Sequence, residues 1–410
     1  MSALDSSIET IRVLPEDRYD RQRLIPWWEQ DRLAAARVLV IGAGALGNEI
    51  LKLLALSGVG HIMIFDMDRI EVSNLSRTVL FKETDAGALK AEVAAERVSE
   101  LNPHTIAVGR AQNIMHELGL GAFVWADVVI CGLDNREARM FVNTSCARTK
   151  RTWIDGAIEG LSGIVRVFDP ARTACYECTM NETDRKLVRD RLSCAMLARD
   201  AIQQGHVPTT NVAASFIAAL EVQEAIKYLH SQPTLDGEGI HVNGMWNDFN
   251  RVQYKRRDDC VAHDSFERVF RLRRGVKDVT LAELLDRAEA RLGEGATLEL
   301  SRDVATRLTC PVCDKTERAG MVLGALRETA ARCPLCGTHR VVDFTGIVVR
   351  DGDVDLSLTP AEIGIPPFDI IVARQGIDKQ EAWLFDTDAE WCLGPLASSF
   401  SMDQLIPKEA

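Results

Sequence analysis

The sequence lacks any long hydrophobic run and any excess of positive charge. No segment approaches the roughly 18 consecutive apolar residues of a membrane-spanning helix, and residues 1–15 are acidic and without the apolar core of a signal peptide. Lys and Arg total 48 against 60 Asp and Glu, which gives a formal net charge of -12. A general nucleic-acid binder normally shows a basic face. These absences favour a cytoplasmic protein that binds neither a membrane nor nucleic acid.

Internal repeats and low-complexity tracts are also absent, whereas cysteine is frequent. The 410 residues are enough for two or three domains, and a composition of 46% hydrophobic and 26% charged residues is that of a globular chain. The chain has 11 cysteines, and six of them stand in Cys-x-x-Cys pairs. In a chain without an export signal, such pairs indicate metal binding and not disulfides.

Strand-like and helix-like segments alternate through the first half of the chain. Apolar runs at 38–41, 61–65, 106–109 and 128–131 are interrupted by helical patterns, the clearest at 48–57 and 90–101. This order predicts a Rossmann-like α/β domain with a doubly wound, largely parallel sheet. Residues 164–168 indicate a later strand, and 211–229 a helix that is apolar nearly all round and therefore belongs in the core.

Composition changes after residue 264. We expect an N-terminal arm at 1–30, the α/β domain at 31–265, a zinc-ribbon domain at 266–345 and a β-rich region at 346–410, the last two together forming an α+β part. Thr280 to Glu283 and Thr359 to Glu362 each fit a helix capping box, which predicts a helix after each of them.

A glycine-rich turn follows the first predicted strand. Gly42, Gly44 and Gly47 permit a tight turn, close approach of the backbone to a phosphate, and close packing of the helix on the strand. The start of the next helix offers free N–H groups to an anion. Asp66 ends the following strand, where a carboxylate can accept hydrogen bonds from ribose hydroxyls. NAD and ATP fit these features equally well.

The residues that follow favour ATP. Asn74 and Arg77 are one helical turn apart and can face the same phosphates, and Lys90 supplies a point cation at the start of a helix. Asp134 directly follows a strand, at the edge of the sheet where ligands bind and where an acid can hold magnesium. Solvated surface charge would explain any one of these residues. The whole set in this order indicates a triphosphate site, because a hydride-transferring dehydrogenase has no use for it.

These segments together resemble the ubiquitin-activating-enzyme-like adenylyltransferases of the ThiF/MoeB-like fold. That family includes the bacterial sulfur-carrier adenylyltransferases for thiamin and molybdopterin and the eukaryotic modifier-activating enzymes. The similarity spans about residues 16 to 265. Its segments are Arg18-Tyr19-Asp20-Arg21-Gln22, the glycine turn, Asp66-Met67-Asp68, Asn74, Arg77, Lys90-Ala91-Glu92, Cys131-Gly132-Leu133-Asp134 and Asp155-Gly156. Thr78 departs from the pattern, since many relatives have glutamine there.

The resemblance implies roles for the residues of the nucleotide site. The expected nucleotide-binding set is Gly42, Gly44, Gly47, Asp66, Asp68, Asn74, Arg77, Lys90 and Asp134. Asp66 would bind the ribose, the amide and the basic residues would bind phosphates, and Asp134 would organise Mg²⁺ and the reacting groups. Arg21, in the N-terminal arm, would act as an arginine finger on the nucleotide of the other subunit, so a homodimer is expected.

Two groups of residues have the spacing of zinc ligands. Cys175 and Cys178 form half of a tetrahedral site, which relatives complete with a second Cys-x-x-Cys after the core helix. This chain has Cys260-Val261-Ala262-His263 instead, which predicts a Cys₃His site, the alternative being a lost site with Cys260 as a packed thiol. The second group, with two proline-containing knuckles typical of a closed structural zinc ribbon, is Cys310, Cys313, Cys333 and Cys336.

Cys194 belongs to neither zinc group. It is flanked by Arg189, Arg191 and Arg199, which favour the nucleophilic thiolate. A lone cysteine is more often a small buried residue, but activating enzymes that form thioesters place their nucleophile in the corresponding crossover segment, here about residues 179–210. The run Cys194-Ala195 followed by Pro208-Thr209-Thr210 is similar to the single-chain homodimeric activating enzyme of the ubiquitin-fold modifier pathway, with a longer spacer.

The function implied is activation of a ubiquitin-like protein that ends in glycine. Adenylation of its C-terminal carboxylate by ATP would be followed by thioester formation on Cys194 and transfer to a conjugating enzyme. Resemblance to bacterial enzymes found beside such partners suggests a role in antiphage defence. Two alternatives stay open: a sulfur-carrier-type adenylyltransferase without thioester chemistry, and a non-catalytic scaffold with a vestigial nucleotide site. An NAD oxidoreductase leaves the basic residues unexplained.

Overall fold

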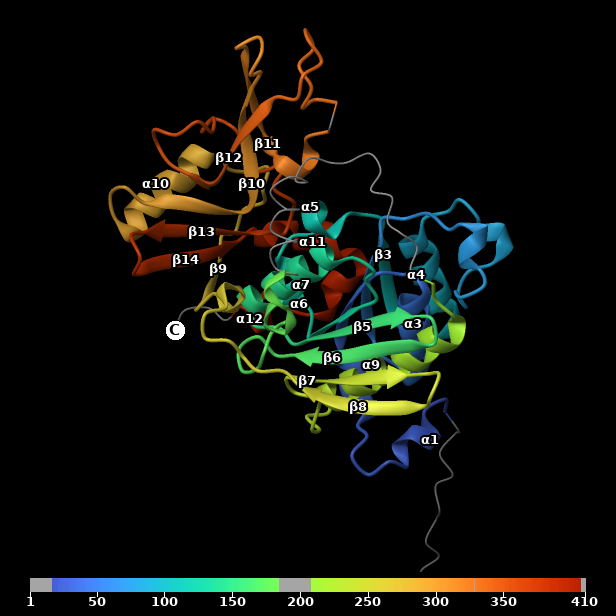
Figure 1. Cartoon of the computed structure of the whole chain (residues 1–410). Helices are drawn as coiled ribbons and strands as arrows, with labels where there is room; N and C mark the ends of the chain where they lie inside the picture. Colours follow the sequence, from blue (N-terminus) through green and yellow to red (C-terminus); the bar gives the residue numbers. More distant parts are fainter. Residues whose placement is uncertain (1–16, 184–207, 328, 407–410) are drawn as a thin grey trace, which may run out of the picture.

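The computed structural model of the chain describes residues 17–183, 208–327 and 329–406, which form two β-sheets (Figure 1). The first sheet has the strand order β3-β2-β1-β4-β5-β6-β7-β8. Its strands are β1 (Arg37–Ile41), β2 (His61–Phe65), β3 (Ile106–Arg110), β4 (Val128–Cys131), β5 (Trp153–Glu159), β6 (Ser162–Phe168), β7 (Glu238–Asn243) and β8 (Asp248–Gln253). Neighbours from β3 to β5 run parallel, and neighbours from β5 to β8 run antiparallel. The predicted Rossmann-like α/β fold is confirmed, with an antiparallel extension at one edge.

Helices cover both faces of this sheet. Val38 and Val40 belong to the core on one face and Leu39 and Ile41 to the core on the other, because successive strand side chains point to opposite faces. The first face carries α3 (Ala45–Ser57), α4 (Lys90–Leu101) and α9 (Asn211–Leu229). The second face carries α6 (Gly121–Trp125) and α7 (Arg136–Thr149). Shorter helices of this part are α1 (Asp20–Arg23), α2 (Gln30–Ala35), α5 (Ile114–Glu117), η1 (Val72–Asn74), η2 (Glu83–Asp85) and η3 (Tyr176–Thr179).

The second sheet is built from the C-terminal part of the chain. Its order is β11-β10-β13-β14-β9, and β12 also pairs with β10. The strands are β9 (Val269–Arg271), β10 (Thr297–Thr309), β11 (Thr316–Val322), β12 (Val341–Val348), β13 (Ile370–Gln375) and β14 (Lys379–Leu384). The helices of this part are η4 (Val261–His263), α10 (Leu281–Leu292), η5 (Leu323–Ala325), η6 (Asp386–Asp388), α11 (Ala389–Leu393), η7 (Gly394–Ser399) and α12 (Met402–Leu405).

The two sheets share one hydrophobic core. Phe368, Leu393 and Leu396 from the C-terminal part pack with Phe65 and Trp125 on the second face of the first sheet. A buried ion pair reinforces this contact. Arg302 on β10 donates to Asp369 at 2.9 Å and to the carbonyl oxygen of Leu118 at 2.6 Å. Asp369 also accepts from the Leu120 amide at 2.8 Å.

The sequence-based domain boundaries near 265 and 345 stay predictions. Strands from both sides of residue 345 join the second sheet. Within the described ranges, no helix combines the length and the apolar character needed to cross a membrane.

Candidate active site and metal centres

The glycine turn between β1 and α3 combines two tight contacts with one open position. A Cβ on Gly42, whose φ is 96°, would lie 2.5 Å from the carbonyl oxygen of Gly132. A Cβ on Gly47 would lie 1.9 Å from the carbonyl oxygen of Gly42. At Gly44, by contrast, nothing lies within 4 Å of the position that a Cβ would take. The first and third glycines are thus required by packing, and the second leaves the space that a ligand phosphate needs at the start of α3.

Asn48 in the first turn of α3 holds this glycine turn in place. Its buried amide donates to the carbonyl oxygens of Ala43 at 2.7 Å and Gly44 at 3.2 Å, and its Oδ1 accepts from the Leu80 amide at 2.9 Å. One side chain therefore connects the turn to the segment that follows Arg77. Sequence reasoning missed this residue. The one available signal was an amide side chain in a predominantly apolar helix.

Asp66, Asp68 and Lys90 lie together at the end of β2. The Asp66 carboxylate accepts from the amides of Ala43 at 2.7 Å and Asp68 at 2.8 Å, and Lys90 donates to Asp68 at 2.9 Å. Burial raises the pKa of Asp66, and the charge of Lys90 and the two amide donors oppose that rise. The structure thus brings an acid pair and a cation to the glycine turn, which is the arrangement expected for ribose and phosphate.

Asn74 and Arg77 follow in a short turn that is held by local bonds. Asn74 Oδ1 accepts from the Glu71 amide at 3.0 Å, and the Arg77 guanidinium donates to the carbonyl oxygen of Ser73 at 2.8 Å. Thr78, the departure from the family pattern, donates its hydroxyl to the carbonyl oxygen of Asn74 at 3.0 Å. These contacts fix the turn, and the binding of phosphates by its two polar side chains stays a prediction.

Asp134 lies exposed in the loop after β4, next to the glycine turn. The Gly132 amide donates to the carbonyl oxygen of Ile41 at 2.9 Å, which joins this loop to the end of β1. Asn135 then caps α7 by accepting from the Ala138 amide at 2.7 Å. Among the described residues, the Asp134 carboxylate itself has a single long contact, from the Asn135 amide group at 3.4 Å. Its loop is therefore positioned by backbone and cap contacts, and the carboxylate is free to face a ligand.

A buried arginine fixes the residue before Asp134. Arg139 donates to the carbonyl oxygens of Leu133 at 2.6 Å and Gly156 at 3.0 Å, and to the carboxylate of Asp155 at 2.7 Å. Arg166 binds the other oxygen of Asp155. The guanidinium of Arg139 thereby connects the loop after β4 to residues within β5. Sequence reasoning missed both arginines, because their partners are distant along the chain.

Glu221 on α9 explains the glycine in Asp155-Gly156. A Cβ on Gly156 would lie 2.4 Å from Glu221 Oε2. Glu221 is fully buried, and its carboxyl has no hydrogen-bond partner in the described part of the chain. Burial raises the pKa of this carboxyl well above its ordinary value, which favours its neutral form. A larger residue at position 156 would displace it.

Arg21 lies near the C-terminal end of α3, whereas the glycine turn lies at the N-terminal end of that helix. Tyr19, beside it, accepts a hydrogen bond from Asn102 at 2.7 Å and packs on Gly58 at the end of α3. The 13 residues of α3 begin at the glycine turn, and this length corresponds to about 20 Å. Arg21 is exposed and makes no hydrogen bond or ion pair with the residues that the structure describes. Its side chain is therefore too far from the glycine turn of the same chain to contact it.

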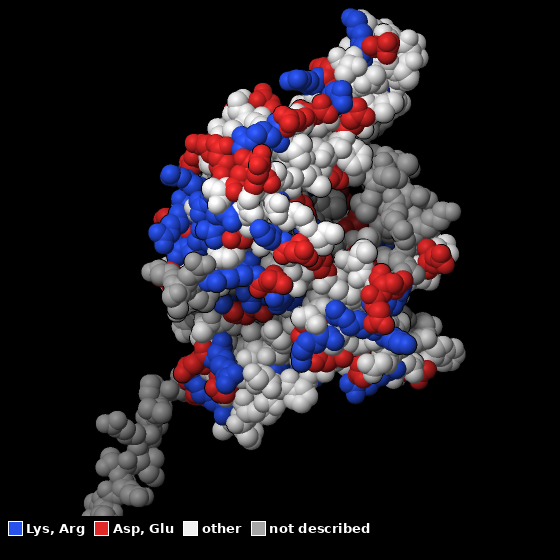
Figure 2. All heavy atoms as spheres, turned by 90° about the vertical axis from the view of Figure 1, so that its left-hand side faces the viewer, with Lys and Arg blue, Asp and Glu red and all other residues white. Residues whose placement is uncertain are grey.

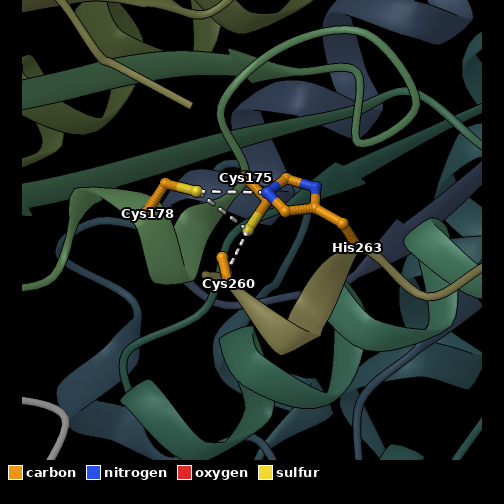
Figure 3. Close-up of side chains that lie close together, drawn as sticks. All are labelled: Cys175, Cys178, Cys260 and His263. Atoms are coloured by element: carbon orange, nitrogen blue, oxygen red, sulfur yellow. Dashed lines mark hydrogen bonds between the residues drawn. The ribbon is translucent and has the colours of Figure 1, made fainter. Parts of the chain in front are cut away.

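The first predicted metal group forms a cluster from two segments that are distant along the chain, 175–178 and 260–263 (Figure 3). The Cys175 sulfur lies 3.8 Å from the sulfurs of Cys178 and Cys260, and the Cys178 sulfur lies 3.1 Å from Nε2 of His263. Sulfurs bound at about 2.3 Å to a tetrahedral zinc are about 3.8 Å apart. Nδ1 of His263 faces the carbonyl oxygen of Pro170 at 3.1 Å, which leaves Nε2 for a metal. The donor set fits zinc.

The second predicted group lies at the end of a second arm, which is formed by β10, β11 and β12. The ligand atoms of Cys310, Cys313, Cys333 and Cys336 all lie within 4.8 Å of one another. Each pair of cysteines sits in a tight knuckle. The residue directly after the second cysteine has a left-handed backbone conformation: Asp314 at φ 51° and Gly337 at φ 71°. Four thiolates without an open position fit a structural zinc. The core beneath the arm is small, so a metal there would contribute much of its stability.

We expect elemental analysis of the purified chain to find about two zinc ions per chain. His263→Ala removes one of four ligands and should lower the content towards one, with loss of thermal stability. His241→Ala, an exposed histidine outside both clusters, is the matched control and should retain both ions. A zinc content unchanged by His263→Ala would remove the histidine from the ligand set.

The described cysteines outside the two clusters are poor nucleophiles. Cys131 and Cys146 are completely buried, and burial raises their pKa well above the ordinary value. Burial also raises the pKa of Cys392 to about 12. Cys194 lies outside the described residues. The clusters hold seven cysteines and these three are buried, so Cys194 is the one thiol of the 11 that neither a cluster nor a core position accounts for.

Residues 19–262 match the ThiF family. The NEDD8-activating enzyme E1 catalytic subunit of Schizosaccharomyces pombe is 38% identical over 161 residues, which are 37% of this chain and 35% of that protein. The corresponding subunit of Arabidopsis thaliana is 41% identical over 157 residues, 35% of this chain and 34% of the relative. Ubiquitin-like modifier-activating enzyme 5 of Aedes aegypti is 26% identical over 246 residues, 57% of this chain and 60% of the relative. The chain thus spans about a third to three fifths of the length of these relatives.

Solved structures agree with the sequence matches. The structure of E. coli MccB with succinimide has a TM-score of 0.52 and 25% identity, and the match covers 61% of this chain and 75% of MccB. The structure of E. coli MccB with ATP gives a TM-score of 0.50 at 25% identity and the same coverage. The fold and the glycine-turn site define a protein of the ubiquitin-activating-enzyme-like class. Since the family match covers more than half of the sequence, the chain belongs to the ThiF family.

Proposed function

We propose that this protein activates a ubiquitin-like protein by adenylating its C-terminal carboxylate with ATP. The observation that carries the proposal is the joint placement of the open glycine turn, the acid pair with Lys90, and the exposed Asp134 at one edge of the sheet. Relatives named as modifier-activating enzymes, and a similar solved structure that contains ATP, support it.

In the proposed reaction, a carboxylate oxygen of the modifier attacks the α-phosphorus of ATP. The bond from that phosphorus to the bridging oxygen breaks, and the electron pair leaves with pyrophosphate. The N–H groups at the start of α3 and the cations of Lys90 and Arg77 stabilise the phosphate charge. Mg²⁺ supplies further charge neutralisation when bound, and Asp134 is the carboxylate that would hold it. Orientation of two bound reactants accounts for much of the remaining acceleration.

The second step that we propose is thioester formation. The Cys194 thiolate attacks the acyl carbon of the adenylate, AMP leaves with the electron pair of the broken bond, and the modifier stays on sulfur for transfer to a conjugating enzyme. The buried state of the other unassigned cysteines supports this choice. ATP–pyrophosphate exchange without a thioester would favour the sulfur-carrier-type alternative. The absence of both activities would favour the scaffold alternative.

A homodimer is part of the proposal, because Arg21 cannot reach the proposed nucleotide site of its own subunit. Mixing Arg21→Ala chains with Asp134→Ala chains should restore exchange, since each heterodimer then contains about one complete site. Subunit exchange followed by an ATP–pyrophosphate exchange assay measures this. Mixing Arg18→Ala chains with Asp134→Ala chains serves as a control for an exposed arginine of the same arm. A monomer at working concentration, or no recovery upon mixing, would place Arg21 outside the active site.

We further propose that the protein works in the cytoplasm, with a modifier ending in glycine and a conjugating enzyme as partners, in antiphage defence. Neighbouring genes that encode a small β-grasp protein and a conjugating enzyme would support this pathway. Neighbouring sulfur-transfer genes of cofactor biosynthesis would contradict it.

A further inference from the structure

A hollow of about 370 Å³ lies between the two parts of the molecule, where α7 ends. One side is formed by the last residues of α7, and the other by residues 266–269 and the end of α12. Its apolar lining comes from Val124, Phe266, Val269, Leu405 and Ile406. The 14 residues of α7 separate it from the Asp134 loop, a length of about 20 Å. A ligand in the hollow therefore does not compete with a nucleotide at the other end of the helix.

The rim of this hollow is basic. Four cations line it, Arg148, Lys150, Arg151 and Arg268, together with one acid, Glu267. Of the four, Arg148 is paired with Glu299 at 2.8 Å. Lys150 is exposed, and its ammonium group has one long contact with the part of the chain that the structure describes, to the carbonyl oxygen of Glu267 at 3.4 Å. Such a concentration of positive charge stands out in a chain whose formal net charge is -12.

Arg151 is the least compensated of these cations. Its guanidinium donates to the carbonyl oxygens of Phe123 at 3.1 Å and Val124 at 2.8 Å, and it has no carboxylate partner in the described ranges. The charge of Asp127 acts on Arg151, but this carboxylate is already bound by Arg37, through the Arg37 amide at 2.9 Å and again through its guanidinium. A half-buried cation without a counter-charge is costly, and an anion in the hollow would compensate it.

A basic ridge continues from the hollow along β9. From Arg268 to Lys277 the chain has five basic residues and no acidic one. Arg271 is paired with acids of the C-terminal part, but Arg273, Arg274 and Lys277 are exposed and form no ion pair with the described residues. Arg273 has a φ of 56°, in a turn that the Asp386 carboxylate holds through the Arg273 amide at 2.6 Å. Figure 2 looks onto the side on which β9 and α10 lie in Figure 1, and shows Lys and Arg gathered there beside a group of Asp and Glu.

The chemistry of this surface identifies the kind of partner. Cations around an apolar hollow fit a peptide segment that carries both carboxylates and apolar side chains. Single-stranded nucleic acid would call for exposed aromatic side chains on which bases can stack. None of the exposed tryptophans and phenylalanines of the described residues lines the hollow or lies on the ridge. We propose that the hollow and the basic ridge together bind an acidic segment of a partner protein, with its apolar side chains in the hollow.

The test uses the full chain and two short fluorescein-labelled peptides, one of alternating Glu and Leu and one of alternating Glu and Ser. Fluorescence anisotropy should show saturable binding of the Glu-Leu peptide that weakens as salt is added. The double variants Lys150→Glu/Arg268→Glu and Arg273→Glu/Arg274→Glu should each weaken it by about tenfold or more, since each reverses two charges at the contact. Lys255→Glu, an exposed lysine elsewhere, should not change binding, and ATP–pyrophosphate exchange should be unchanged in all three variants.

Each other outcome overturns the proposal. Equal binding of the Glu-Ser peptide would show that the apolar hollow is not used. Tighter binding of a single-stranded oligonucleotide of equal length, lost in the same variants, would assign the surface to nucleic acid. No saturable binding of the Glu-Leu peptide below about 1 mM at low salt would leave the surface without the proposed partner. Because the assay contains no ATP or modifier, its failure would not affect the proposed adenylation.

Discussion

Replacing Asp134 by alanine is expected to lower modifier-dependent ATP–pyrophosphate exchange by about 10²–10³-fold, the usual cost of one lost charge-stabilising group. The carboxylate is exposed, and its one contact within the described residues is the long one from Asn135. Its removal takes nothing from the fold, because Arg139, the Asn135 cap and the Gly132 amide hold the loop. Thermal stability should therefore stay within experimental error of the wild type while activity falls.

The exchange of labelled pyrophosphate into ATP measures this effect at saturating modifier. Asp351→Ala removes an exposed acid of the C-terminal part and should leave exchange unchanged. Asp134→Asn distinguishes charge from size: it keeps the shape of the side chain but loses most of the activity if the carboxylate organises the cation and the reacting groups. Exchange of Asp134→Ala within a few-fold of the wild type would remove this residue from the site.

Local signals predicted the first sheet and its helices well. The predicted strand at 61–65 and the predicted helix at 211–229 agree with the ends of β2 and α9. Periodicity suffices there, because each element is apolar on the face or faces that it buries. The prediction for β6 is shorter by two residues, and α3 begins earlier than its pattern suggested, within the glycine motif itself.

Long-range pairing explains what the sequence did not reveal. β10 was not predicted, because the alternation of Leu298 and Leu300 is interrupted by Arg302, which is buried through its pair with Asp369. β8 is exposed along most of its length and so has no apolar pattern. Asn48 and Arg139 act through carbonyl groups that no spacing rule identifies. In each case the partner, and not the residue type, makes the residue important.

The two capping boxes show how the same local signal can end differently. Thr280 and Glu283 form their reciprocal bonds, and α10 follows as predicted. Thr359 and Glu362 form the same reciprocal bonds at 2.7 Å and 3.3 Å, yet the chain makes a turn and no helix follows, so that prediction was wrong. Gly364, with φ at 93°, and the two prolines after Ile365 end the turn before a helix can propagate.

The largest effect is expected at Cys194. Adenylation needs no thiol, whereas thioester formation needs one that is accessible and deprotonated. Cys194→Ala should therefore retain ATP–pyrophosphate exchange and lose completely the reductant-sensitive adduct between enzyme and modifier. Non-reducing gel electrophoresis after incubation with ATP and modifier, with and without thiol, measures the adduct. Cys194→Ser should form an oxygen ester that resists thiol but is cleaved by mild base.

Cys392→Ala is the matched control, because that thiol is buried and its pKa is raised to about 12. It should form the adduct as the wild type does. If Cys194→Ala still formed a reductant-sensitive adduct, the nucleophile would lie among cysteines that the structure buries or clusters, and the assignment by elimination would fail. If the wild type formed no adduct despite robust exchange, the reaction would end at the acyl-adenylate. The spacer between Cys194 and Pro208 would then have no role in thioester chemistry, and the sulfur-carrier-type alternative would replace the proposed second step.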